Sequence, residues 1–146
     1  MQLLQVLLQV KQQRRVECGR FVVNKNKSIA IGITVLNVLV ASGFSIAGIV
    51  NPASFLPAGF VPNNASMVFA MYAAARTIPL ALFVIIAALR RSTRTLIDLG
   101  ILAGTVQFVD GFIGVFQHDA GKTFGPLAIA VLQAYGIVIL HRTRAE

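Results

Sequence analysis

Cysteine and acidic residues are both scarce in this chain of 146 residues. The single cysteine, Cys18, cannot form an intrachain disulfide or a metal site of the multi-cysteine kind, and this also excludes dithiol redox chemistry. Only 12% of the residues are charged, and five of them are Asp or Glu, whereas 56% are hydrophobic. A soluble domain contains about 25% charged residues. The composition is therefore that of a membrane protein.

The excess of positive charge does not indicate a nucleic-acid-binding protein. The formal net charge is +8, but nucleic-acid-binding proteins place basic residues among polar or aromatic ones on one surface. Here Lys and Arg gather in short clusters between apolar runs. We therefore expect membrane lipids, and no nucleic acid, as partners.

Four apolar runs organise the sequence, at residues 29–50, 67–89, 95–117 and 124–140. About 20 residues are needed to cross a hydrocarbon core, so the fourth run lies at the lower limit. Each run must be helical, because an open strand in lipid would leave backbone groups unpaired. The sequence predicts an all-α, polytopic four-transmembrane-helix bundle over residues 28–141, with a basic segment, 1–27, before it and a short tail, 142–146, after it.

The basic clusters predict the orientation of the four spans. They comprise Lys11, Arg14, Arg15, Arg20, Lys25 and Lys27 before the first run, Arg90, Arg91 and Arg94 in the second connection, and Arg142 and Arg144 after the fourth run. The first connection has no charge, and Lys122 is the one basic residue of the third. Cytoplasmic flanks of membrane helices are enriched in Lys and Arg. We therefore expect a multi-pass protein of the cell inner membrane with both termini cytoplasmic.

Residues 1–27 have two interpretations. Leu3, Leu4, Leu7 and Leu8 recur at helical spacing ahead of basic residues, which is typical of a short helix lying on the inner leaflet. The alternative, which we favour, is a frayed cytoplasmic tail or an extension from an upstream start. The segment does not resemble a secretory signal, because the basic residues of such a signal precede its apolar stretch and here they follow it.

Two ionisable residues of opposite sign lie near the middle of neighbouring spans. A helix rises about 1.5 Å per residue. Counted along the helix from the centre of its own run, Arg76 lies about 3 Å, and Asp110 about 6 Å, toward the outer side of the membrane. An isolated charge in a span costs roughly 2.5 to 3.5 kcal/mol on insertion scales. We therefore predict an ion pair between Arg76 and Asp110.

Further polar residues surround this pair. Tyr72 lies one helical turn from Arg76, and Asn37, Gln107 and Gln133 lie near the middle of their own runs. Small residues mark the faces on which helices pack closely. One such stripe, which includes Gln107, is Gly100, Gly104, Gly111 and Gly114, and another is Ala41, Ser42, Ser45 and Gly48. The polar cluster is therefore expected inside the bundle.

The segment "HDAGKTFGP" predicts a charged turn at the outer mouth of the bundle. Asp119 and Lys122 flank Gly121, and we expect Thr123 to cap the fourth helix with Pro126 in its first turn. At the opposite side of the membrane, Asp98 can pair with Arg94 at an i, i+4 spacing. His118 and His141 fall on opposite sides, so no metal site is expected.

Two motifs resemble those of the small DoxX-like membrane proteins. They are "YAAARTIPLAL" in the second run and "VQFVDGFIGVFQHDAGKTFGP", which bridges the third and fourth, with Asp119, Lys122, Gly125 and Pro126 forming a D-x-x-K-x-x-G-P turn. The resemblance covers roughly residues 28 to 140 and implies a four-helix bundle. It implies no single reaction, because members are linked variously to quinone-coupled oxidation and to redox stress. The long, proline-rich first connection departs from the tighter one that we expect of such proteins.

The sequence leaves several functions open. In the leading hypothesis, a small amphipathic molecule such as a quinone or lipid binds a site built from Arg76, Asp110, Gln107, Tyr72 and Gln133. Its apolar tail would lie among Phe108, Phe112 and Phe116 or in lipid. The polar cluster can equally be structural, with hydrogen bonds that only join helices.

Three other classes of function remain. Asp110 can act as a proton or ion relay in a small transporter, and the chain can be a structural subunit that packs on a partner or on copies of itself. An enzyme is the least supported class, because the sequence shows no nucleophile with a base, no metal set and no phosphate-binding loop. We expect no cofactor.

Overall fold

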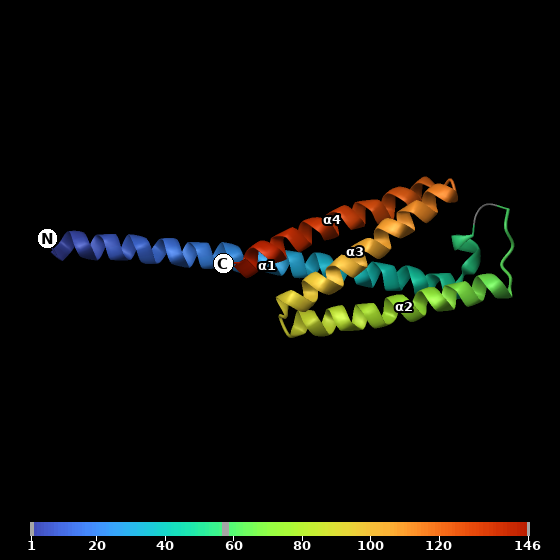
Figure 1. Cartoon of the computed structure of the whole chain (residues 1–146), viewed down its shortest axis with the longest axis horizontal. Coiled ribbons are helices and arrows are strands. Elements are labelled where there is room, and N and C mark those ends of the chain that lie inside the picture. The colour runs from blue at the N-terminus through green and yellow to red at the C-terminus, as the bar shows by residue number, and fades with distance from the viewer. Residues whose placement is uncertain (1, 57–58, 146) are drawn as a thin grey trace.

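The computed structural model describes the backbone of residues 2–56 and 59–145, and the side chains of residues 25–53, 55–56 and 59–143. Within these residues the chain forms the α-helices α1 (Gln2–Val50), α2 (Asn64–Leu89), α3 (Thr93–Phe116) and α4 (Ala120–Ala145) (Figure 1). A short 3₁₀ helix, η1 (Pro52–Phe55), follows α1, and the described backbone contains no strand. The prediction of an all-α fold is confirmed.

Each α-helix contains a segment long and apolar enough to cross a membrane. These segments are Lys25–Val50, Asn64–Leu89, Thr93–Phe116 and Ala120–Thr143. They coincide with the four apolar runs, and the fourth is longer than predicted. Large apolar side chains such as Phe69, Phe83 and Val131 are exposed on the outside of the bundle, as lipid-facing residues are.

Helix α1 is much longer than a membrane span. Its 49 residues extend over roughly 70 Å, and its first half projects beyond the other helices (Figure 1). The prediction of an interfacial helix or a frayed tail depends on the side chains of residues 1–24, Cys18 and Leu3 among them, which the structure does not describe. It therefore stays a prediction.

The two ends of the bundle differ in their connections. We call the end with the α2–α3 turn, Arg90–Ser92, the basic end, and the end with residues 51–63 and the α3–α4 turn, residues 117–119, the loop end. Both turns are Schellman motifs, in which Ser92 N–H donates to Ala87 O at 3.0 Å and Asp119 N–H donates to Gly114 O at 3.2 Å. Arg91 and His118 accordingly adopt φ angles of 51° and 53°.

Helix α3 packs most extensively on α4, through the glycine stripe. A Cβ atom on Gly111 would lie 2.7 Å from Cγ of Leu127, and one on Gly114 would overlap the backbone carbonyl of Lys122. That carbonyl can approach so closely because Pro126, four residues later, has no N–H to engage it. The absence of side chains on α3 therefore sets the distance between the two helices.

The apolar core lies mainly toward the basic end. Its fully buried members there include Val84, Leu96 and Leu140, from three different helices. Helices α2 and α4 occupy a diagonal, and among the described residues their backbones do not approach each other closely. From the Arg90–Ser92 turn, α3 crosses toward α4 and diverges from α2 (Figure 1). The pair α1/α2 and the pair α3/α4 are therefore packed together at the basic end and spread apart at the loop end.

The Gly114 contact generates the first prediction. We expect Gly114→Ala to destabilise the protein by about 1 to 3 kcal/mol, because the new methyl group meets backbone that cannot rotate away. Gly125→Ala is the matched control, since nothing lies within 4 Å of the position that its methyl group would take and alanine favours helix. Thermal unfolding of the purified protein in detergent measures both. Equal midpoints for the two variants would contradict the close α3–α4 contact.

Candidate functional site

A hydrogen-bonded chain of buried polar side chains joins three helices at the centre of the bundle. Gln107 Nε2 of α3 donates to Asn37 Oδ1 of α1 at 2.8 Å, and Asn37 Nδ2 donates to Gln133 Oε1 of α4 at 3.0 Å. Gln133 Nε2 in turn donates to Thr34 Oγ1 at 3.0 Å. All four side chains are at most 5% exposed. We call this set the amide network.

The glycine stripe makes room for the amide network. A Cβ atom on Gly100 would lie 2.7 Å from Gln133 Nε2, and one on Gly104 would lie 3.2 Å from Gln133 Cγ. The structure thus places Gln107 and Gln133 in the interior, as the stripe indicated, and adds Thr34, which sequence reasoning missed. Its position three residues before Asn37, on the same side of α1, was the available signal. Among the described side chains, no buried nitrogen or oxygen atom lacks a hydrogen-bond partner, so the network is internally satisfied.

A second polar contact joins α1 to α2. Ser42 Oγ donates to Thr77 O at 3.2 Å, and Thr77 Oγ1 donates to Ser45 Oγ at 3.0 Å. The stripe of small residues on α1 therefore packs on α2, where a Cβ atom on Gly48 would meet Cβ of Ala70 at 3.8 Å. These short side chains hold the α1/α2 pair together without using Arg76.

Arg76 and Asp110 do not form the predicted ion pair. Arg76 Nε donates to Tyr72 O at 3.2 Å, both charged side chains are exposed, and no ion pair within 4.0 Å joins them in the described part of the chain. The prediction of direct contact is wrong because α2 and α3 diverge toward the loop end, so a shared depth does not bring the side chains together.

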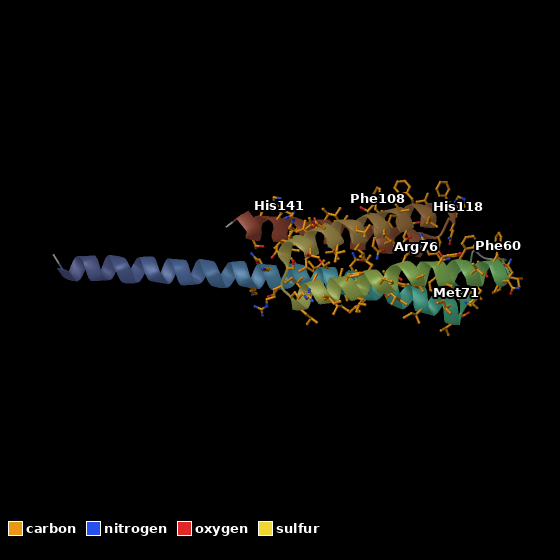
Figure 2. The ribbon with its side chains drawn as sticks, turned by 60° about the horizontal axis from the view of Figure 1, so that its bottom comes forward. Phe60, Met71, Arg76, Phe108, His118 and His141 are labelled. Carbon is orange, nitrogen blue, oxygen red and sulfur yellow. The ribbon has the colours of Figure 1, made fainter. Side chains whose placement is uncertain are left out.

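The two charged residues still belong to facing surfaces. Arg76 lies on the same side of α2 as Leu80 and Ala87, which are packed in the core nearer the basic end. Asp110 lies on the same side of α3 as Ala103, which is buried there too. Figure 2 shows Arg76 directed from α2 toward α3 and α4, and its bond to Tyr72 O turns the guanidinium toward the loop end, where Asp110 lies.

We call Tyr72, Arg76 and Asp110 the charged face. Tyr72 is 61% exposed, and Arg76 and Asp110 are exposed as well. All three side chains are therefore accessible from outside the protein. The phenylalanines proposed to hold an apolar tail are not part of this face. Phe108 and Phe112 form an edge-to-face pair with centroids 5.1 Å apart, but each is two residues from Asp110 and so about 200° around the helix. Phe108 and Phe112 therefore lie on a different side of α3 from Asp110, and the placement of an apolar tail stays a prediction.

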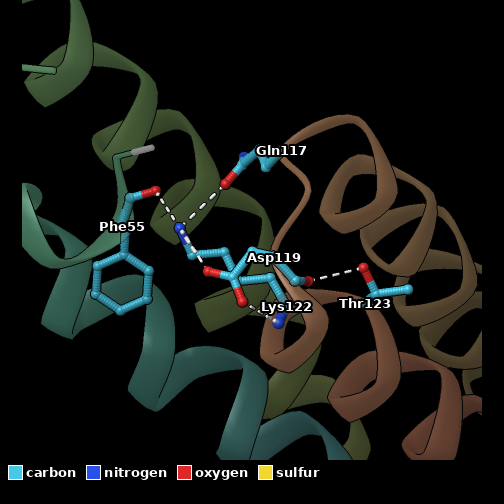
Figure 3. Close-up of polar contacts among 5 residues, drawn as sticks. All are labelled: Phe55, Gln117, Asp119, Lys122 and Thr123. Carbon is cyan, nitrogen blue, oxygen red and sulfur yellow. Dashed lines mark hydrogen bonds and ion pairs between the residues drawn. The ribbon is translucent and has the colours of Figure 1, made fainter. Parts of the chain in front are cut away.

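The turn at the loop end is built around Lys122 (Figure 3). Lys122 Nζ donates to Phe55 O of η1 and to Gln117 Oε1, both at 3.0 Å, and lies 3.5 Å from Asp119 Oδ2. It thereby ties the first connection to the α3–α4 turn. The predicted charge pair of Asp119 and Lys122 is formed.

The residue that caps α4 is Asp119 rather than Thr123. Helix α4 begins at Ala120, and Asp119 Oδ1 accepts a hydrogen bond from Lys122 N–H at 3.1 Å. The Thr123 hydroxyl instead donates to Asp119 O at 2.8 Å. The cap prediction is wrong because an aspartate was available one turn earlier. The N–H of Lys122 lowers the pKa of Asp119, and the Lys122 ammonium acts in the same direction.

At the basic end, Asp98 and Arg94 are both exposed and form no ion pair within 4.0 Å in the described part of the chain. The predicted i, i+4 pair is therefore wrong. His118 and His141 are exposed in separate regions (Figure 2). Among the described side chains, no group of three His, Cys, Asp or Glu residues is placed to hold a metal ion.

Comparisons of the chain with protein-family models, with curated proteins and with solved structures find no match. The class of the protein therefore follows from its own structure. Four helices long and apolar enough to span a membrane pack as one bundle, with apolar side chains on the outside and a satisfied polar network inside. The chain is a multi-pass integral membrane protein.

The amide network generates the second prediction. We expect Asn37→Ala to destabilise the bundle, because Gln107 Nε2 and Gln133 Oε1 would each lose a buried partner at about 1 to 3 kcal/mol per group. Thr105→Val is the control, since the exposed Thr105 hydroxyl bonds only within its own helix, to Ile101 O. Circular dichroism during heating in detergent gives the unfolding midpoints. A midpoint for Asn37→Ala equal to that of the unchanged protein would refute a stabilising network.

Proposed function

We propose that this protein binds the polar head of a small amphipathic molecule, such as a quinone or lipid, at the charged face. The observation that supports the proposal is the state of Arg76 and Asp110, which are exposed, opposite in charge and not in contact. Each lies within a membrane-spanning segment. An unpaired charge facing hydrocarbon costs roughly 2.5 to 3.5 kcal/mol, so a head group that pairs with both is favoured.

The chemistry of the charged face defines the kind of head group. The Arg76 guanidinium offers donors in a planar fork, the Asp110 carboxylate accepts, and the Tyr72 hydroxyl does either. A suitable head group has at least one acceptor for Arg76 and one donor for Asp110. Quinols and many phospholipid head groups satisfy this requirement. The apolar part would remain in the bilayer beside α2 and α3.

In this proposal Gln107 and Gln133 act indirectly. Their amides bond to Asn37 and Thr34, so they hold α1, α3 and α4 together on the basic-end side of the charged face. Arg76, Asp110 and Tyr72 are then the binding residues. The proposal also keeps the DoxX-like assignment, for which the support is the motifs in the second to fourth spans together with the four-helix architecture.

The third prediction concerns ligand retention. We expect Arg76→Gln and Asp110→Asn each to weaken retention of added decylbenzoquinol or lysophospholipid at least tenfold, because each removes one charge from the charged face. Native mass spectrometry of the full chain, titrated with each probe in turn, measures the bound fraction. Asp98→Asn is the matched control, because it removes an exposed carboxylate at the basic end.

Arg76→Lys separates charge from hydrogen-bond geometry, and it should retain part of the binding because it keeps the positive charge. Unchanged retention of both probes by Arg76→Gln and by Asp110→Asn would remove the basis of the proposal. The unfolding midpoints of the variants serve as the check that the bundle is intact.

We also propose that the basic end faces the cytoplasm of a cell with an inner membrane, with both termini on that side. The support is the distribution of cations, with Arg90, Arg91, Arg94 and Arg142 at the basic end and Lys122 at the loop end. Cytoplasmic loops carry this excess of Lys and Arg.

The fourth prediction tests this orientation. In a Cys18→Ser background, we expect Ala120→Cys to react with a membrane-impermeant thiol reagent in intact cells, and Ser92→Cys to react only after permeabilisation. Ala120 begins α4 at the loop end, and Ser92 lies in the α2–α3 turn. The opposite labelling pattern would reverse the proposed orientation.

A further inference from the structure

The basic end carries a dense set of cations contributed by α1, α3, α4 and the α2–α3 turn. Six Lys and Arg side chains belong to the described part of this end. They are Lys25 and Lys27 of α1, Arg90 and Arg91 of the α2–α3 turn, Arg94 of α3 and Arg142 of α4. Five of the six are exposed, and Lys27 is half-buried.

The register of the helices places these cations at one level. A Cβ atom on Gly136 of α4 would lie 3.6 Å from Ala30 O of α1, and these two helices run antiparallel. Arg142, six residues beyond Gly136, is therefore level with the residues just before Lys25. The α2–α3 turn lies at the same end, because Leu96 and Ala87 pack in one core with Ala30 and Leu140.

None of the six side chains is neutralised within the described part of the protein. They have no hydrogen bond or ion pair to another described residue, and the nearby carboxylate of Asp98 is unpaired as well. The loop end differs, since its cation, Lys122, is held by Asp119, Gln117 and the carbonyl of Phe55. The basic end is thus a positive surface whose counter-charge must come from outside the described bundle.

The position of this surface identifies the partner. The six residues lie at or within a few residues of the ends of the membrane-spanning segments. When such segments cross a bilayer, their ends meet the lipid head groups. Long basic side chains at such positions extend toward the head groups. We infer that the basic end is a binding surface for anionic phospholipids, with the guanidinium groups of Arg90, Arg91 and Arg94 on the lipid phosphodiester. Planar guanidinium groups bind phosphate oxygens through two parallel hydrogen bonds.

This inference is independent of the charged face, since none of the six cations belongs to it. It also differs in ligand chemistry. The charged face presents one cation and one carboxylate and so fits a head group with donor and acceptor, whereas the basic end presents cations alone and so selects negative charge.

The fifth prediction concerns lipid selectivity. We expect the purified full chain to bind phosphatidylglycerol more tightly than phosphatidylcholine, and the triple variant R90Q/R91Q/R94Q to lose phosphatidylglycerol affinity on the order of a hundredfold. Native mass spectrometry with each lipid titrated separately measures both. Binding of phosphatidylcholine should not change, and raising the salt concentration should reduce the preference of the unchanged chain.

Two further variants keep the test decisive. R90K/R91K/R94K preserves the charge and should retain most of the selectivity, whereas loss in this variant as well as in the glutamine variant would indicate that guanidinium geometry is required. K25Q/K27Q/R142Q removes the same charge from other helices and should weaken binding of phosphatidylglycerol without altering the α2–α3 turn. Equal affinity of the unchanged chain for the two lipids, or full phosphatidylglycerol affinity in both charge-removing variants, would overturn the inference.

Discussion

The close contact between α3 and α4 is the constraint on which the rest of the bundle depends. Glycines on α3 let the backbone of α4 approach until the Lys122 carbonyl rests on Gly114, and they leave space for the Gln133 side chain beside Gly100 and Gly104. With that space, Gln133 reaches α1 and bonds to Asn37 and Thr34. Side chains in place of these glycines would displace the Gln133 amide, and three helices would lose their common hydrogen-bonded centre.

The same contact explains why the charged face is open. Helix α3 packs along α4, and α2 packs along α1 through contacts of Ser42, Ser45 and Thr77. The four helices therefore form two pairs. The apolar core joins the pairs at the basic end, the amide network joins them at the centre, and Lys122 joins the α3–α4 turn to η1 at the loop end. Arg76 and Asp110 lie between the last two connections, where the divergence of α2 and α3 keeps them apart.

Patterns that depend on one helix at a time were predictable from the sequence. The four spans follow from apolar length, and the glycine stripe with Gln107 follows from helical periodicity, because neither requires knowledge of a neighbour's angle. The Arg76 to Asp110 contact failed because depth along a helix says nothing about the divergence of two helices. The prediction that Thr123 caps α4 was wrong because Asp119, one turn earlier, competes for the same role. Which of the two caps the helix depends on the Schellman turn that precedes α4. Thr34 was overlooked because a single hydroxyl in an apolar run carries little signal by itself.

The charged groups of this protein meet three different environments, and each is matched by a different kind of partner. Lys122 at the loop end is balanced within the chain, by Asp119 and two oxygen acceptors. The six cations of the basic end have no partner among the described residues, but they lie where a bilayer supplies phosphate. Arg76 and Asp110 form no ion pair with a described residue and have no head groups at their depth, since they lie within the spans. A charge in that position needs a polar group brought into the hydrocarbon region. This is why a ligand is proposed for the charged face, and why bulk lipid is a sufficient partner only for the basic end.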